Sequence, residues 1–452
     1  MPTRVMQDTP LAHLGALVLP ALLLTTMTAQ AIDIPHEEFQ LENGLNVILH
    51  RDDSLPQIVV NLWYGVGSKD EELGRSGFAH LFEHLMFMGT VHLPGSGFDE
   101  RMEAHGGWNN AWTSEDATDY YEAGPSNLLE TFIWMESDRM RGLAEAMTQE
   151  KLDLQRDVVR NERRQSVEDT PYGVVWEAMS PALYPSDHPY GHTVIGTHED
   201  LQAAEVDDVV RFFNTWYVPN NASLVIAGDF NPNQARTWIQ QYFGSIPAGV
   251  LPERSKPAAL DKPQQSVVET EDNVQIPLTV MVWHTPASLQ PGDAALDVVA
   301  AILGDGRSSR MYQDLVTETG NALELGANQY SQMLGSIFAV TGKPSPNTKL
   351  EDLETKLQAH IDRLAKDGPT EAEMERVRNQ LEVSFISDLE GLQRRASALN
   401  RYRYIAGTPD FVNADLERYR KLTADEVQAA AATLTEDRRC SLRVRPSEGG
   451  EK

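Results

Sequence analysis

The order of strand-like and helix-like stretches repeats on either side of a proline-rich segment, and this repetition limits the folds open to the chain. The first half begins with a hairpin pattern around Asn43-Gly44, followed by the continuous apolar strand "QIVVNLWYGVG" and an apolar helix. Residues 244–265 then hold four prolines and no hydrophobic periodicity, which indicates a linker. Beyond them, the strand pattern "QIPLTVMVWHTP" is again followed by a helix pattern, "GDAALDVVAAILGDG". The chain therefore reads as two copies of one unit.

The repetition predicts an α+β fold of two tandem homologous domains, each a two-layer α/β unit with a mostly antiparallel sheet packed with helices. The predicted segments are a signal peptide at residues 1–31, a first domain at 32–250, a linker at 251–265 and a second domain at 266–452. A length of 452 residues suits two domains of ordinary size. The only cysteine is Cys440, so an intrachain disulfide is excluded and the hydrophobic cores must stabilise the fold.

The first 31 residues have the pattern of a secretory signal peptide. Arg4 gives a positive start, "LGALVLPALLL" an apolar core, and Ala29-Gln30-Ala31 a cleavage site of small residues. An uncleaved membrane anchor is the alternative, which Pro20 and the short apolar core disfavour. We expect an exported protein, periplasmic or secreted after cleavage near Ala31, without stable membrane insertion.

The charge of the chain argues against two classes of partner. A formal net charge of −29 leaves no basic surface to neutralise nucleic-acid phosphates or anionic lipid. The hydrophobic fraction of 41% and charged fraction of 23% are ordinary for a soluble globular protein. Solubility through self-repulsion is the simplest reading of the acidity.

The run "GFAHLFEHLMFMG" places three polar side chains on an otherwise apolar helix, which Ser76 is predicted to cap and Gly89 to end. His80, Glu83 and His84 stand at i, i+3 and i+4, so they share one face of the helix. Two imidazoles one turn apart can bind the same metal ion.

The second half has apolar residues where the first has these polar ones. Aligning "LMFMG" with "AAILG" pairs His80 with Ala295, Glu83 with Val298 and His84 with Val299. The first copy has therefore replaced core residues by a polar group.

Zinc suits this polar group best, because it takes nitrogen and oxygen ligands, three of them from protein in catalytic sites. Bound zinc lowers the pKa of a water molecule to about 7. Glu83 is then placed to act as general base and to return the proton to the leaving amine. We expect one Zn²⁺ per chain. A pair of hydrogen-bonded core or surface histidines without metal is the alternative.

The segment "KLDLQRDVVRNERRQSVED" is expected to supply the third ligand. One predicted stripe of its helix consists of Gln155, Val158, Val159 and Glu162. The arginines are predicted to lie largely off this stripe; they are Arg156, Arg160, Arg163 and Arg164. An inward-facing Glu162 would be costly unless a metal ion or an arginine neutralised it. Glu168, toward the helix end, is the alternative donor.

The predicted hairpin at residues 107–122 follows the metal-binding helix closely in the chain. An exposed strand here can accept an extended peptide by strand addition. Asn110 and Trp112 alternate onto one face and are candidate substrate contacts. The alternative is a hairpin that only packs its aromatic side chains. His92, His105 and His284 have no partner at ligand spacing, so we expect structural roles for them.

The motifs "HLFEH", the following "GT", "GGWNNAWTSEDATDYYE" and "RDVVRNERRQ" together resemble the pitrilysin or insulinase family of zinc metallopeptidases, whose motif is H-x-x-E-H. The resemblance extends from about Phe39 to the C-terminus. It is closest to the short two-domain type, such as the zinc-bearing beta subunit of mitochondrial processing peptidase and its bacterial relatives. It implies zinc on His80, His84 and Glu162, Glu83 as the base of a metalloendopeptidase, and a second domain without ligands.

The chain departs from the family pattern in two places. In many relatives a glutamate two turns before the third ligand supports the site; here Gln155 stands there, which can hydrogen-bond a ligand but has no charge. Relatives also have an arginine and, seven residues later, a tyrosine in the second domain. Val316 and Leu323 occupy those positions and cannot donate to an oxyanion, while Arg310 belongs to another part of the motif.

These departures suggest that a second two-domain chain, lacking zinc ligands, supplies the Arg/Tyr pair. A homodimer remains open. The leading hypothesis is a zinc endopeptidase, or the zinc-bearing subunit of a heterodimeric one, that hydrolyses peptides or unfolded segments. The alternatives are a non-catalytic assembly or scaffold protein of the same fold, and a maturation subunit with one dedicated partner. The presence of Glu83 beside three ligands favours the peptidase.

Overall fold

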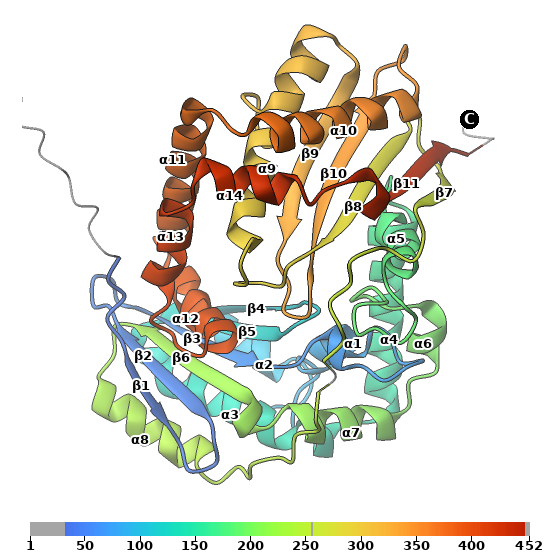
Figure 1. Cartoon of the computed structure of the whole chain (residues 1–452). Coiled ribbons are helices and arrows are strands. Elements are labelled where there is room, and N and C mark those ends of the chain that lie inside the picture. Colours follow the sequence, from blue (N-terminus) through green and yellow to red (C-terminus); the bar gives the residue numbers. More distant parts are fainter. Residues whose placement is uncertain (1–31, 255, 448–452) are drawn as a thin grey trace, which may run out of the picture. The chain divides into compact units, whose positions relative to one another are not determined.

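A computed structural model describes residues 32–254 and 256–447 (Figure 1). The predicted signal peptide, residues 1–31, lies outside the described residues. No helix in the described part of the chain has the length and apolar character needed to cross a membrane.

The first sheet is built from strands of the first half. They are β1 (Glu37–Gln40), β2 (Asn46–Arg51), β3 (Gln57–Tyr64), β4 (Trp108–Thr113), β5 (Thr118–Pro125) and β6 (Ala222–Gly228). Their order is β1-β2-β6-β3-β5-β4, and only β2 and β6 run parallel. The central strand β3 is buried in every residue after Gln57, as its continuous apolar sequence predicts. Strand β4 forms one edge.

The second sheet repeats this topology with strands of the second half. They are β7 (Val267–Asp272), β8 (Leu278–Thr285), β9 (Ala322–Tyr330), β10 (Ser336–Pro344) and β11 (Arg439–Pro446). Their order, β7-β11-β8-β10-β9, matches β2-β6-β3-β5-β4 strand for strand, and here only β7 and β11 run parallel. The predicted class is confirmed: two α/β units with mostly antiparallel sheets.

Helices cover both sheets. Those of the first half are α1 (Phe78–Leu85), α2 (Gly97–Glu103), α3 (Leu129–Ala146), α4 (Gln149–Arg163), α5 (Val175–Leu183), α6 (His198–Gln202), α7 (Val206–Trp216) and α8 (Pro232–Phe243). Those of the second half are α9 (Asp293–Leu303), α10 (Leu350–Asp367), α11 (Glu371–Asp388), α12 (Leu392–Ala406), α13 (Val412–Arg420) and α14 (Ala424–Ala431). Short helical segments span Ser68–Asp70, Ser126–Leu128, Arg164–Glu168, Pro219–Asn221, Tyr312–Glu318 and Glu436–Arg438.

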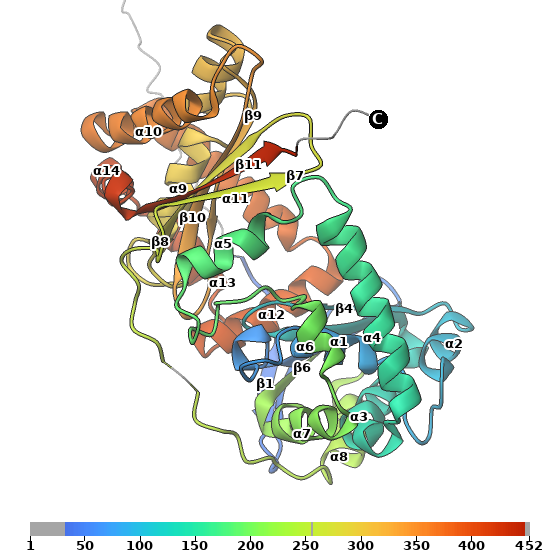
Figure 2. The ribbon, with the colours of Figure 1, turned by 90° about the vertical axis from the view of Figure 1, so that its right-hand side faces the viewer.

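Each half contributes one helix to the sheet of the other half (Figure 2). Helix α5 packs on β7 and β11, where Met179 joins an apolar cluster with Val282 and Leu442 of the second sheet. Helix α12 packs in return on β3 and β6, and Asn400 Nδ2 donates to Asn61 Oδ1 at 2.6 Å. The two halves are therefore held together by an exchange of helices. The exact domain boundaries along the sequence stay a prediction.

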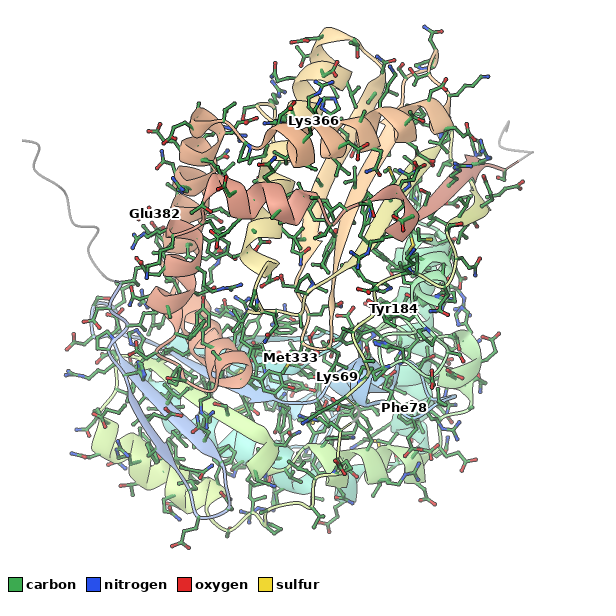
Figure 3. The ribbon with its side chains drawn as sticks, viewed as in Figure 1. Lys69, Phe78, Tyr184, Met333, Lys366 and Glu382 are labelled. Atoms are coloured by element: carbon green, nitrogen blue, oxygen red, sulfur yellow. The ribbon has the colours of Figure 1, made fainter. Side chains whose placement is uncertain are left out.

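The turns of two hairpins, one from each half, also meet (Figure 3). Asp116, in the β4–β5 turn, accepts hydrogen bonds from Met333 N at 2.9 Å and from Tyr190 Oη at 2.6 Å. Its carbonyl oxygen accepts from Lys69 Nζ and from Tyr404 Oη of α12. The hairpin that contains β4 is thus fixed at its turn by both halves.

Helices α1 and α9 begin in the same way. Each follows a glycine in the left-handed region, Gly77 with φ 86° and Gly292 with φ 96°. His80 lies three residues after the first glycine, and Ala295 lies three residues after the second. The helix starts therefore reproduce the register of the sequence alignment, in which apolar residues of α9 stand opposite the polar ones of α1.

Candidate metal centre

A buried carboxylate, rather than the predicted Ser76, satisfies the N-terminus of α1. Glu71 accepts hydrogen bonds from Gly77 N at 3.0 Å and Ala79 N at 2.7 Å. Ser76 instead donates from N and Oγ to Asp200. The prediction of Ser76 as cap was wrong because the cap comes from the preceding loop, not from the adjacent residue. Burial raises the pKa of Glu71 well above its usual range, and the two N–H donors oppose this rise.

Helix α1 ends at Leu85, before the predicted Gly89. The chain continues in tight turns, in which Met88 N donates to Leu85 O and Gly89 has a φ of 79°. Gly89 therefore serves a turn after the helix. The helix is short, but all three polar residues of the motif lie within it.

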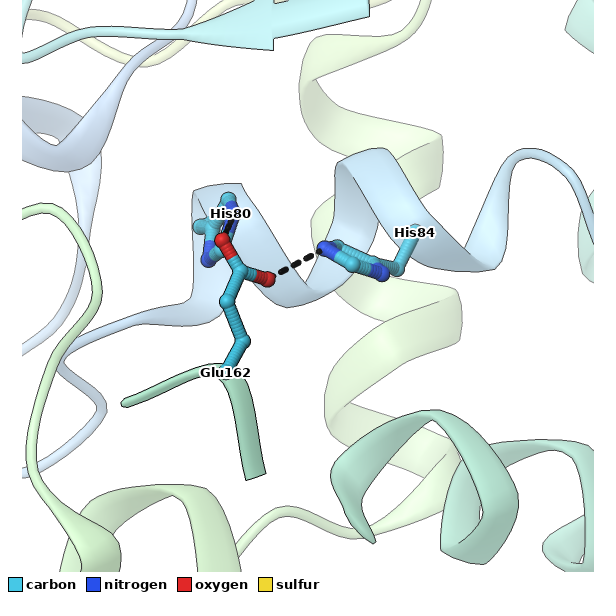
Figure 4. Close-up of side chains that lie close together, drawn as sticks. All are labelled: His80, His84 and Glu162. Carbon is cyan, nitrogen blue, oxygen red and sulfur yellow. Dashed lines mark ion pairs between the residues drawn. The ribbon is translucent and has the colours of Figure 1, made fainter. Parts of the chain in front are cut away.

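Two histidines of α1 and one glutamate of α4 converge (Figure 4). His84 Nε2 lies 3.2 Å from Glu162 Oε2, and His80 Nε2 lies 3.8 Å from Glu162 Oε1. The three ligand atoms lie within 4.8 Å of one another. Within the described residues, no other group of three His, Cys, Asp or Glu side chains is arranged to hold a metal ion.

The charge states of His80 and Glu162 suit a metal ion, whereas the pKa of His84 is raised. Burial, with the nearby His84, lowers the pKa of His80 to about 4, so its ring is neutral at pH 7. The hydrogen bond from His84 lowers the pKa of Glu162, which keeps its carboxylate ionised. Burial opposes protonation of His84, but the hydrogen bond and charge of Glu162 outweigh it and raise the pKa of His84. Two imidazoles and one carboxylate are the donors that zinc takes in hydrolases, so the residues fit the ion.

Glu83 projects from the same helix toward strand β4. Its Oε2 accepts a hydrogen bond of 2.5 Å from Thr113 Oγ1, at the end of that strand. Burial raises the pKa of Glu83, and the Thr113 hydroxyl opposes this rise. A carboxylate with a raised pKa, held at one oxygen and free at the other, is suited to proton transfer. Sequence reasoning missed both Glu71 and Thr113, because neither belongs to the helix motif.

The faces of α4 differ from the prediction. Val158 is 40% exposed, whereas Arg156 and Arg163 are buried together with Val159. The prediction that these two arginines lie off the inward face was wrong. Each is buried because its guanidinium is paired: Arg156 with Asp153 and the Ala204 carbonyl, and Arg163 with Glu168, Glu177 and the Gly196 carbonyl.

The side chain of Glu162 is 44% exposed, so it reaches α1 from the open side of the helix pair and not from a closed core. Glu168, the alternative donor, pairs with Arg163 and with His198 Nε2 at 2.8 Å, away from the two histidines of α1. Gln155 lies next to the group: it hydrogen-bonds His84, and its Nε2 is 2.7 Å from Met88 Sδ. These contacts place Gln155 where a residue supporting a ligand would stand.

Strand β4 is the free edge of the first sheet beside this group. Asn110 and Trp112 are exposed and share one face of the strand, opposite to the face from which Thr113 reaches Glu83. Trp112 packs edge-to-face on Trp63, with ring centroids 5.1 Å apart. A role of Asn110 and Trp112 in substrate binding stays a prediction.

The remaining histidines singled out in the sequence have other partners. His92 Nδ1 lies 2.6 Å from Asp138 Oδ1, His105 Nδ1 2.8 Å from the Arg101 carbonyl, and His284 Nε2 3.0 Å from the Leu183 carbonyl. None of the three belongs to the group of candidate ligands, His80, His84 and Glu162.

In the second half, the positions expected for an Arg/Tyr pair carry no polar side chain. Val316 packs against the core of that half, and Leu323 is 49% exposed on β9. Arg310 is engaged by both carboxylate oxygens of Glu373, at 2.7 and 2.8 Å. It therefore has a structural partner within its own half.

Comparison with known sequences identifies the family. The sequence model described as insulinase (peptidase family M16) matches residues 46–198, and that described as peptidase M16 inactive domain matches residues 203–381. The chain is 30% identical over 379 residues to zinc protease PqqE of Helicobacter pylori, covering 82% of this chain and 84% of that protein. The chain belongs to the insulinase family, peptidase family M16. The resemblance recognised in the motifs is thereby confirmed.

Other proteins match over about nine tenths of the chain. An uncharacterized zinc protease of Bacillus subtilis, YmxG, is 24% identical over 419 residues, covering 91% of this chain and 98% of that protein. The crystal structure of a protease from Helicobacter pylori superimposes with a TM-score of 0.84 at 25% identity, covering 91% of this chain and 99% of that one. The periplasmic protease PqqL of Escherichia coli shares the fold, with a TM-score of 0.74 at 18% identity over 93% of this chain but 49% of PqqL.

The four residues of the candidate site all lie within the first of the two family matches. His80, Glu83, His84 and Glu162 all fall within residues 46–198, whereas the match described as inactive contains the apolar residues of α9.

Proposed function

We propose that this chain is a zinc-dependent endopeptidase, or the zinc-bearing subunit of a heterodimeric peptidase, acting on peptides or unfolded segments. The observation that supports this most is the convergence of His80, His84 and Glu162, with Glu83 on the same helix beside a free strand edge. The names of the zinc protease relatives support both the metal and a peptidase-type activity.

In this proposal His80, His84 and Glu162 hold one zinc ion. When bound, zinc supplies Lewis-acid chemistry, polarising a carbonyl group and lowering the pKa of a water molecule. Glu83 Oε1, which is not engaged by Thr113, takes the proton of the attacking water and gives it to the leaving amine.

Strand β4 holds the peptide in this proposal. The substrate pairs with the free edge of the strand through backbone hydrogen bonds, which fix its position without requiring one sequence. Asn110 and Trp112 are proposed to contact it.

Two substitutions separate metal binding from catalysis. Glu83→Gln should keep one zinc per chain and lower cleavage of a quenched peptide library at least 1,000-fold, in the range found when a group essential to proton transfer is lost. His80→Ala should lose the zinc itself, measured by metal analysis after dialysis. His105→Ala is the matched control, since His105 bonds only the Arg101 carbonyl. Turnover that survives Glu83→Gln contradicts the mechanism.

The scaffold alternative predicts a different result from the same preparation. A non-catalytic subunit would bind no stoichiometric zinc, or would bind it without cleaving any peptide. The dedicated maturation subunit would cleave one partner but not the library. The presence of Glu83 together with three ligands favours the peptidase, because a structural role requires no base.

We further propose that a second chain completes the site. Neither Val316 nor Leu323 can donate a hydrogen bond to an oxyanion, and Arg310 is engaged by Glu373. PqqL of Escherichia coli, of which this chain covers 49%, supports an arrangement in which two such units work together. Full activity of the purified chain as a monomer or homodimer would show that no distinct partner is needed.

Export is also part of the proposal. It rests on the signal-peptide pattern of residues 1–31 and on the periplasmic location in the name of the PqqL neighbour. The N-terminus of the protein recovered from the native cell envelope should begin near Ile32, and an intact N-terminus at Met1 contradicts cleavage.

A further inference from the structure

The third candidate ligand stands where its helix changes form. Glu162 is the last residue but one of α4, and a π-helical segment, Arg164–Glu168, follows Arg163. Such segments interrupt the regular hydrogen bonds of an α-helix. The side chain of Glu162 is 44% exposed and is ion-paired with His80 and His84. Its distance from the two histidines therefore depends on how this end of α4 is held relative to α1.

Arg163, the residue after Glu162, holds this end of the helix. It is buried, and all three nitrogens of its guanidinium donate hydrogen bonds. Nε donates to the Gly196 carbonyl at 3.1 Å, Nη1 donates to Glu168 at 3.0 Å, and Nη2 donates to Glu177. The guanidinium is planar, so it fixes the direction of these bonds as well as their length. The end of α4 is therefore tied at three points, one of which is the backbone of a distant loop.

That loop, formed by Ile195, Gly196 and Thr197 and called the 195–197 loop below, lies directly on the start of the other ligand helix. A Cβ atom added to Gly196 would lie 2.3 Å from Ser76 O. One added to Gly77, the residue before α1, would lie 2.6 Å from Ile195 O. Thr197 N also donates to Ser76 Oγ at 3.2 Å. The two glycines thus let the backbones touch without a side chain between them.

The start of α1 is also held by a buried carboxylate. Glu71 accepts hydrogen bonds from Gly77 N at 3.0 Å and Ala79 N at 2.7 Å, and its side chain is fully buried. His80 follows Ala79 directly, so these bonds fix the backbone from which the first histidine projects. The 195–197 loop therefore rests on a part of α1 that is itself fixed.

Two other arginines of α4 bind the same region of the chain farther from α1. Arg160 Nη1 donates to Gln202 Oε1 at 2.8 Å, and Arg156 Nη2 donates to the Ala204 carbonyl at 2.5 Å. These bonds tie the middle of α4 to α6 and to the turn that follows it (Figure 2). Of the three arginines, Arg163 is the one that reaches the 195–197 loop.

We propose that Arg163 is a positioning residue of the candidate metal centre: through the 195–197 loop it sets the separation between Glu162 on α4 and the two histidines on α1. This inference rests on the zinc site of the proposed function and adds a residue that is not itself a ligand. Without this tie, Glu162 follows the movements of the helix end and spends less time beside the histidines. Loss of a group that supports a ligand typically weakens metal binding about 10- to 100-fold.

Arg163→Lys in the full chain tests the tie. Lysine keeps the charge but lacks the planar fork, so it cannot bond all three acceptors. Chelator competition should show zinc affinity lowered about 10- to 100-fold. The visible absorption bands of the Co²⁺-loaded chain, which depend on ligand geometry, should change as well. Unchanged zinc affinity together with an unchanged Co²⁺ spectrum overturns the proposal.

Arg156→Lys is the matched control for that variant. Arg156 lies on the same helix and is as buried as Arg163, each being 7% exposed. Both variants should lower the melting temperature, but Arg156→Lys should leave zinc affinity within about 3-fold, since it does not touch the 195–197 loop. Equal losses of zinc affinity in the two variants contradict a specific role of Arg163.

Gly196→Ala tests the same contact from its other end and leaves Arg163 in place. The added Cβ must push the 195–197 loop away from Ser76, so zinc affinity should fall about 10-fold or more. Gly74→Ala is the matched control, because Gly74 has a similar φ of 78° in the loop before α1 and an added Cβ there meets no atom within 4 Å. Both variants carry the backbone strain, and equal zinc affinities in the two contradict the proposal.

A double substitution shows whether Arg163 acts through Glu162. In the Glu162→Ala chain the two histidines remain, and adding Arg163→Lys should change the residual zinc affinity by less than about 2-fold. A loss as large as the one in the wild-type background would mean that Arg163 supports the fold as a whole, and it would overturn the positioning role.

Zinc binding keeps this proposal distinct from the proposed function. If the wild-type chain binds one zinc ion but cleaves no peptide, and Arg163→Lys still weakens zinc binding, the peptidase function fails and the positioning role stands. If the wild-type chain, with its partner chain where activity requires one, cleaves peptides and Arg163→Lys changes neither zinc affinity nor the Co²⁺ spectrum, the positioning role fails and the peptidase stands. A wild-type chain that binds no zinc overturns both.

Discussion

The hydrogen bonds between α12 and the first sheet give a prediction for stability. Asn400 is fully buried, and its Nδ2 donates to Asn61 Oδ1 at 2.6 Å and to the Asn61 carbonyl at 3.1 Å. Asn400→Ala removes two neutral hydrogen bonds, each contributing about 1 kcal/mol, and leaves two buried acceptors to be partly resatisfied. It also removes Asn400 Oδ1, a buried oxygen without a hydrogen-bond partner, and the removal of this unfavourable group offsets about 1 kcal/mol of the lost stability. With a small cavity added, we expect a net loss of about 2 kcal/mol in the free energy of unfolding.

Urea denaturation followed by far-UV circular dichroism and by tryptophan fluorescence measures this loss. Because α5 and α12 are exchanged between the halves, both probes should report one shared transition, and Asn400→Ala should lower its midpoint. Arg394→Ala, on the same helix, is the control: its ion pair with Asp388 is exposed, so the change should stay below about 0.5 kcal/mol. A loss below about 0.5 kcal/mol for Asn400→Ala, or two separated transitions in the wild type, would refute the coupling of the halves through α12.

Three further results are expected at the metal centre. The pKa of His84 is raised above 6.5, so below that raised pKa the ring holds a proton that zinc must displace. Chelator competition from pH 8 to 5 should therefore show the zinc affinity falling about tenfold per pH unit below the pKa of His84. His80 takes up a second competing proton only near pH 4. Glu162→Ala should lose stoichiometric zinc in metal analysis while Glu168→Ala retains it, and the reverse result would exchange the two assignments. Thr113→Val should lower kcat about tenfold at unchanged zinc content, whereas Thr113→Ser should restore most of it; equal rates for both variants would show that the hydroxyl does not orient the base.

Local patterns in the sequence were sufficient to predict the helix that carries His80, Glu83 and His84 and the strands around it. The i, i+3, i+4 spacing of His80, Glu83 and His84 requires only helical geometry, and the structure keeps all three on α1. The strands along the chain and the hairpin turns were predicted from apolar runs bounded by turn residues such as glycine and asparagine. The position of Glu162 near the two histidines was predicted by combining its helix position with the family resemblance.

The sequence could not reveal which groups neutralise the buried charges. Arg156 and Arg163 were predicted to lie largely off the inward-facing stripe of their helix, but both are buried and paired. Their acceptors include the carbonyls of Ala204 and Gly196, far away in the chain, and no local pattern marks these contacts. The cap of α1 by Glu71 escaped prediction for the same reason, since the carboxylate reaches the helix across a loop.

The exchange of helices between the halves was also outside the reach of the sequence. An amphipathic helix has the same periodicity whichever sheet covers its apolar face, so nothing in residues 392–406 distinguishes the first sheet from the second. The exchange is shown by tertiary contacts such as those of Asn400 with Asn61 and of Met179 with the second sheet.

The exchange also sets the order in which the molecule is completed during synthesis. The six strands of the first sheet have all left the ribosome once Gly228 has emerged, but one face of that sheet lacks its covering helix until Ala406 has been made. A nascent chain of intermediate length therefore carries a finished hydrogen-bonded sheet with an uncovered side that includes Trp63. We expect chaperones to bind such a chain until α12 has been made. A truncation before α12 should yield a fragment that aggregates and not a smaller working domain.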